Sequence, residues 1–182
     1  MTRVGTRSVR LLAGTIPAVV AIAALAACGG GSSPAQERAQ SQALQAARTL
    51  TERLRTDQLV SSKGIVASYG KCDAGATHVQ YVASQPLEPL GETLTQAQLS
   101  AQLVTKMSGL GWKLTQQPRA ARDTIFYTMA GHGLTGELYV NDSGLGLNAN
   151  LFVYSACFDA GSGAAGLLKA ESTYPAPSPS SS

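Results

Sequence analysis

Four short segments between residues 112 and 154 alternate apolar with polar side chains: residues 112–116, 123–130, 134–140 and 145–154. A repeat of two predicts β-strands that turn one side toward a core. Short connections rich in Gly, Asn and Asp, such as 131–133 and 141–144, predict tight turns and therefore antiparallel pairing. Residues 65–69 and 77–84 add one or two strand candidates. We expect an antiparallel β-meander of about 4–6 strands.

A capped helix is predicted directly before this series. Thr95 is placed to cap it, Gln98 completes a capping box, and Leu94 can pack against Leu99. Apolar residues then recur at helical spacing, and glycines end the pattern: Leu99, Leu103, Met107, Leu110, Gly109 and Gly111. We expect this helix to cover one side of the sheet.

A longer helix is predicted near the N-terminus, with Ser33 as its cap and Pro34 in its first turn. The pattern runs to about residue 61. Its apolar stripe is narrow and consists of Leu44, Ala47, Leu50 and Leu54. Such a weak stripe indicates a helix that lies on a surface.

Alternation also divides the strand residues between two faces of the sheet. The predicted core face holds Ile125, Tyr127, Met129, Leu134, Leu138, Val140, Leu147, Leu151 and Val153. The opposite face mixes rings with amides and forms a candidate binding face of Phe126, Tyr139, Asn148, Asn150, Phe152 and Tyr154. Two interpretations stay open: the N-terminal helix packs across this face, or the face is exposed and binds a partner.

The first 27 residues read as a secretory signal peptide. Arg3, Arg7 and Arg10 precede an apolar stretch that is short for a membrane-spanning helix. Without this segment the chain has eleven basic and eleven acidic residues, so its excess of positive charge disappears. The charge therefore gives no support to nucleic acid as a partner. At the other end, residues 161–182 are rich in Ser, Pro and Gly and are expected to be disordered.

The residues Leu25, Ala26, Ala27 and Cys28 close the apolar stretch, and Gly29 follows. This sequence resembles the lipobox of bacterial lipoproteins, and the abundance of Ala, Gly and Arg resembles the actinobacterial members. The resemblance covers only the N-terminus. It implies cleavage before Cys28 and a diacylated cysteine, whose two acyl chains hold a protein stably on a membrane. Residues 28–33 would then be a lipidated tether to one domain over residues 34–160.

Two further cysteines remain, Cys72 and Cys157. Neither has the spacing of a metal site, and an even pair in an oxidising compartment is most simply a disulfide. We therefore predict a structural bond between them.

Motifs for catalysis are weak. The two histidines, His78 and His132, have no G-x-S-x-G element with them and cannot complete a zinc site. No phosphate loop, paired carboxylates or calcium loop is recognisable, so no cofactor or metal is expected. Arg119, Arg122 and Lys113 form a small basic patch that is either solvated or a contact site for an anionic wall polymer or protein.

These observations predict an α+β domain held by lipid on the outer face of the cytoplasmic membrane. We expect a non-enzymatic binding or structural role, with an envelope protein or a wall component as partner. A carrier of a small apolar ligand between the Leu99 helix and the sheet is the alternative, and a hydrolase is less favoured.

Overall fold

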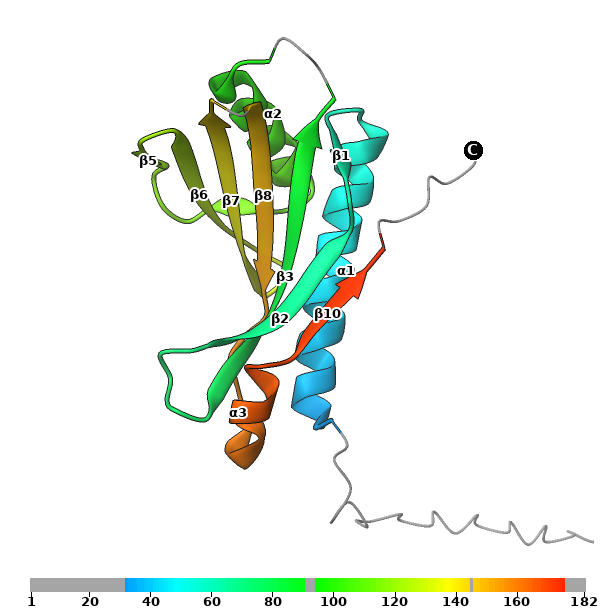
Figure 1. The fold of residues 1–182 in the computed structure, drawn as a ribbon, viewed down its shortest axis with the longest axis vertical. Coiled ribbons are helices and arrows are strands. Elements are labelled where there is room, and N and C mark those ends of the chain that lie inside the picture. Colours follow the sequence, from blue (N-terminus) through cyan, green and yellow to red (C-terminus); the bar gives the residue numbers. More distant parts are fainter. Residues whose placement is uncertain (1–31, 91–93, 145, 176–182) are drawn as a thin grey trace, which may run out of the picture. The chain divides into compact units, whose positions relative to one another are not determined.

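The computed structural model describes residues 32–90, 94–144 and 146–175 (Figure 1). The predicted lipidation site, Cys28, lies outside the described residues. The helical elements are α1 (Pro34–Thr56), α2 (Gln96–Gly109), the 3-10 turn η1 (Gly161–Gly163) and α3 (Ala164–Leu167). The strands are β1 (Val60–Ser62), β2 (Ile65–Lys71), β3 (His78–Pro89), β4 (Lys113–Leu114), β5 (Arg119–Ala121), β6 (Thr124–Gly131), β7 (Leu134–Ser143), β8 (Gly146–Tyr154), β9 (Phe158–Asp159) and β10 (Glu171–Tyr174).

The α+β class is confirmed, and the described strands pair antiparallel in the order β10-β2-β3-β8-β7-β6-β4. The expected number of four to six strands is wrong, because the described sheet has ten. The additional strands β1, β5 and β9 pair with β3, β6 and β3 respectively. The strands that were not predicted, β1, β5, β9 and β10, are two to four residues long, which is too short to show an alternating pattern.

The predicted bounds of the first helix and of one turn are wrong. The first helix ends at Thr56 rather than near residue 61, because Gln58 has a φ of 55° and reverses the chain. Val60, which is fully buried, then begins β1 and pairs with Pro89. The expected turn at 141–144 is also shifted, since β7 continues to Ser143 through ladder pairs with β8.

Helix α1 packs into the core and does not merely lie on a surface. Its buried residues follow helical spacing and are small toward the N-terminus and large toward the C-terminus: Ala39, Ala43, Ala47, Leu50, Thr51 and Leu54. The alanines give a helix backbone close access to a sheet, and their small size made the stripe look weak in the sequence. The hydroxyl of Thr51 donates to the Oε1 atom of Gln85, a fully buried β3 residue. That hydrogen bond satisfies one of the few polar groups in the interface.

Helix α2 is confirmed with its capping box. Thr95 Oγ1 accepts from the Gln98 amide at 3.3 Å, and Gln98 Oε1 accepts from the Thr95 amide at 2.9 Å. Leu99, Leu103 and Met107 have no exposed surface. The side-chain amide of Gln96 donates to the carbonyls of Asp123 and Val140, both at 2.8 Å, so the start of α2 is attached to β7 and to the residue before β6.

The predicted end of the domain at residue 160 and the predicted disorder of residues 161–175 are wrong, because these residues belong to the fold. This segment forms η1, α3 and then β10, which pairs with β2 over four residues. The hydroxyl of Tyr174 accepts from Gln40 Nε2 of α1 at 3.2 Å, and Arg48 lies 5.5 Å from the ring centre. Long-range pairing therefore orders a segment whose composition resembles that of a flexible tail.

The predicted disulfide is present between Cys72, after β2, and Cys157, before β9, with Cα atoms 6.2 Å apart. It joins positions 85 residues apart in the sequence. The bond thus links the β2–β3 connection to the segment that leads out of the meander.

Candidate functional site

The two long helices cover the same face of the sheet, which we call the inner face. Thr51 of α1 bonds to Gln85, and Gln85 pairs in register with Leu151, an inward residue of β8. The buried residues of α2 belong to the same core. Figure 1 shows both helices behind the sheet. The interpretation in which α1 packs across the aromatic face is therefore wrong, because the alanine row lies against the other side of the strands.

The opposite side is called the outer face, and four rings form a continuous row on it. The ring centres of Phe126 and Tyr139 are 4.9 Å apart, those of Tyr139 and Phe152 are 5.0 Å apart, and those of Phe152 and Tyr154 are 6.4 Å apart. Cross-strand pairing explains the row, since Phe126 is opposite Tyr139 in the β6–β7 ladder. All four residues are partly exposed. Within the described part of the chain, no helix packs on them.

A carboxylate lies within this row. Glu137 Oε2 accepts hydrogen bonds from the hydroxyls of Tyr139 at 2.5 Å and Tyr154 at 2.8 Å. The Oε1 atom of the same carboxylate accepts none of the hydrogen bonds found among the described residues. An ionised carboxylate can accept about four hydrogen bonds, so Glu137 retains capacity for a partner that donates.

The environment of Glu137 changes the acidity of both tyrosines. Burial, followed by the hydrogen bond to Glu137, raises the pKa of Tyr139 to about 12, while Arg119 acts in the opposite direction. Burial also raises the pKa of Tyr154, again with Glu137 as the next cause. Both hydroxyls therefore remain protonated at neutral pH and hold the carboxylate in place.

Amide side chains extend the outer face beyond the rings. Asn150 is directly opposite Tyr139, and Asn148 is opposite Asn141 in the same ladder. Asn141 Nδ2 donates to Asn148 Oδ1 at 2.9 Å, and the Thr124 hydroxyl donates to Asn141 Oδ1 at 2.7 Å. Arg119 of β5 pairs in register with Phe126 and is exposed at the end of the ring row. The face thus offers apolar rings, a carboxylate, amides and the Arg119 cation at its end.

The structure brings the six residues of the candidate binding face together on the outer face: Phe126, Tyr139, Asn148, Asn150, Phe152 and Tyr154. Sequence reasoning missed Glu137. The available signal was its position two residues before Tyr139, which places both side chains on one face of a strand. Arg119 was assigned to a basic patch and not to this row, because the pairing of β5 with β6 was not foreseen.

The two histidines lie apart in the topology. His132, with a φ of 56°, and Gly133, with a φ of 76°, form the turn between β6 and β7, and a His132 ring nitrogen lies 2.8 Å from the Leu110 carbonyl. His78 pairs with Asp159 in the β3–β9 ladder. Among residues 32–90, 94–144 and 146–175, no group of three or more metal-binding side chains is found.

A hollow is present on the inner side, between α1 and the turn at His132, with a cavity volume of about 460 Å³. The expected place for a carrier cavity was the contact of the Leu99 helix with the sheet, where Leu99, Leu103 and Met107 have no exposed surface. For the described helices, none combines the length and apolar character that crossing a membrane needs.

Comparisons of this chain with protein-family models, with curated proteins and with solved structures find no match.

Proposed function

We propose that this protein is a lipoprotein anchored through Cys28 on the outer face of the cytoplasmic membrane, where its outer face binds a hydroxyl-rich wall component without catalysis. The observation that carries the proposal is the partly exposed row of four rings around a carboxylate whose Oε1 atom accepts no hydrogen bond from the described residues. The anchor rests on the signal and lipobox pattern of residues 1–28.

The residue types favour a wall saccharide over a protein partner. A sugar ring has one apolar face that packs on aromatic rings and an edge of hydroxyls that donate hydrogen bonds. Glu137 Oε1 and the Asn150 amide are placed to accept such hydrogen bonds beside Tyr139. Tyrosine and phenylalanine held by strands also lose little conformational freedom on binding, which preserves affinity.

Cosedimentation of the purified protein with insoluble cell-wall material tests the binding. Tyr139→Ala and Glu137→Gln should each reduce the bound fraction at least threefold, because the first removes the central ring and the second removes the charge. Glu37→Gln, on an exposed position of α1, is the matched control and should bind as the wild type does. Equal binding by all four proteins would exclude the outer face as the site, and retention by a protease-sensitive component of the wall would identify a protein partner.

The anchor is tested separately in cells fed a labelled fatty acid. The wild type should incorporate the label and stay with the membrane, whereas Cys28→Ser should take up no label and should accumulate as an uncleaved precursor. Identical labelling of the two proteins would contradict lipidation at this cysteine.

A further inference from the structure

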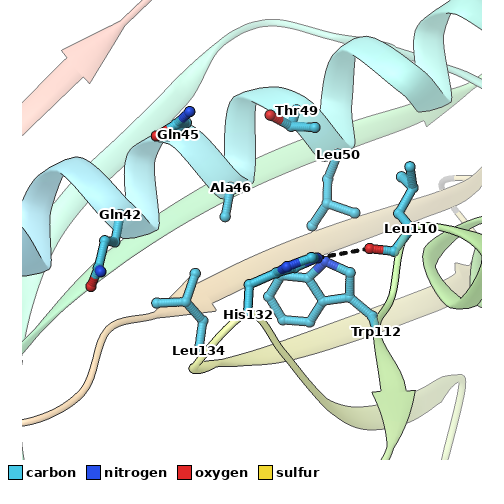
Figure 2. Close-up of a pocket in the computed structure, with 9 residues that line it drawn as sticks. All are labelled: Gln42, Gln45, Ala46, Thr49, Leu50, Leu110, Trp112, His132 and Leu134. Carbon is cyan, nitrogen blue, oxygen red and sulfur yellow. Dashed lines mark hydrogen bonds between the residues drawn. The ribbon is translucent and has the colours of Figure 1, made fainter.

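The hollow on the inner side is a built pocket with distinct walls. One wall is the α1 surface of Gln42, Gln45, Ala46, Thr49 and Leu50, and the other consists of Leu110, Trp112, His132 and Leu134. Figure 2 shows the side chains of Ala46 and Leu50 pointing from α1 toward Trp112, His132 and Leu134. The volume of about 460 Å³ is within the range of sites that bind small organic molecules.

Two features keep this pocket open. Ala46 is the shortest side chain that could line the helix wall without breaking the helix, so it leaves space where a larger residue would fill the gap. On the other wall the Trp112 ring is packed down against the sheet, where Gly131 and Gly136 make room for it. A Cβ atom at Gly136 would lie 2.7 Å from Trp112 Cζ3. The ring thus borders the pocket and does not occupy it.

The lining is apolar at the base and polar at the edge, with no charged side chain among the described lining residues. Ala46, Leu50, Leu110, Trp112 and Leu134 supply the apolar walls. His132 is fixed because its Nε2 must donate to the Leu110 carbonyl, which can only accept. In the neutral ring Nδ1 is then an acceptor, and the glutamine amides on the α1 wall can donate or accept.

We propose that this pocket binds an uncharged, mainly apolar small molecule with a hydroxyl or carbonyl group at one end. A charged ligand would lose hydration there without gaining an opposite charge from the lining, whereas an apolar body gains by leaving water. The amides of Gln42 and Gln45 and the hydroxyl of Thr49 suit a single neutral polar end. This site is separate from the outer face and independent of the wall binding proposed above.

Fluorescence of the full chain with N-phenylnaphthylamine, an uncharged apolar dye, tests the pocket. Trp112 is the one tryptophan of the sequence and borders the site, so bound dye should quench its emission by energy transfer. We expect saturable binding to the wild type and at least tenfold weaker binding to Ala46→Phe, whose ring fills the space. Ala35→Phe adds the same ring at an exposed position of α1 and should bind the dye as the wild type does.

Three results would overturn the proposal: no saturable quenching in the wild type, equal affinity in Ala46→Phe, or equal affinity for the anionic dye anilinonaphthalene sulfonate. Urea unfolding of both phenylalanine variants shows whether they are folded. If Ala46→Phe is unfolded, Thr49→Phe at the pocket edge replaces it and should weaken binding in the same way. Glu137→Gln should leave dye binding unchanged, which separates this site from the outer face.

Discussion

Gly136 of β7 is the position where the packing of the inner face can be tested most directly. Gly136→Ala would place a Cβ atom 2.7 Å from Trp112 Cζ3 and 3.0 Å from Cε3. To relieve this contact, the ring, which is 2% exposed and also lies against Gly131, would have to leave its packing on the sheet. Forcing an extra methyl group into a filled core costs about 1–3 kcal/mol. We therefore expect Gly136→Ala to lose about 2 kcal/mol of the free energy of unfolding.

Urea unfolding followed by the emission of Trp112 measures this loss. With a denaturant slope of about 2 kcal/mol/M, a loss of about 2 kcal/mol lowers the midpoint by about 1 M. Gly70→Ala in β2 is the matched control, because its new Cβ atom would meet nothing closer than 3.4 Å. That variant should be unchanged or slightly more stable, since alanine reduces the freedom of the unfolded chain.

A double variant separates the steric clash from a general intolerance of alanine in β7. In a Trp112→Phe background, the ring atoms that the new Cβ would meet are absent. Gly136→Ala should then lower the free energy of unfolding by less than half as much as in the wild type. Circular dichroism follows the unfolding transitions in both backgrounds. An equal cost in both backgrounds, or a Gly136→Ala midpoint equal to that of the wild type, would refute the proposed packing of the tryptophan against the glycines.

Three further predictions follow from the fold. Replacing Cys72 and Cys157 with alanine opens a loop of 85 residues and should lower the free energy of unfolding by about 4.5 kcal/mol on the chain-entropy model. Urea unfolding measures this loss, and a loss below about 1 kcal/mol would contradict the prediction. Ala47→Leu at a fully buried position of α1 should lower the free energy of unfolding by about 1–3 kcal/mol through overpacking, whereas Ala35→Leu at an exposed position should leave it unchanged. Equal stability of the two variants in urea unfolding would exclude the docking of α1 on the inner face. The tyrosinate absorbance of wild type minus that of Tyr139→Phe should have a midpoint near pH 12 instead of 10. Because the unfolded chain releases this proton at lower pH than the folded protein, the free energy of unfolding should fall as pH rises from about 10 to 12. A midpoint at 10 would disprove the buried contact with Glu137.

Local signals in the sequence determined several parts of this protein. The Thr95 capping box and the apolar repeat behind it specify α2, because the hydrogen bonds of a helix start are made within one turn. Alternation placed Tyr139 and Phe152 on one face of the sheet, because successive side chains of a strand point to opposite sides. The number of cysteines also predicted the bond between Cys72 and Cys157, because only these two remain if Cys28 carries lipid.

Long-range contacts decided the rest. The alanines of α1 do not identify the face that they pack on, since a small side chain fits either face. Only docking placed them on the inner side, so that no described helix covers the outer face. The ordering of residues 171–174 depends on pairing with β2, about a hundred residues earlier in the chain. The pocket beside Ala46 likewise exists only where α1 passes the turn at His132. Sequence periodicity reports which side of an element is apolar, but which partner covers that side is determined by packing across the whole fold.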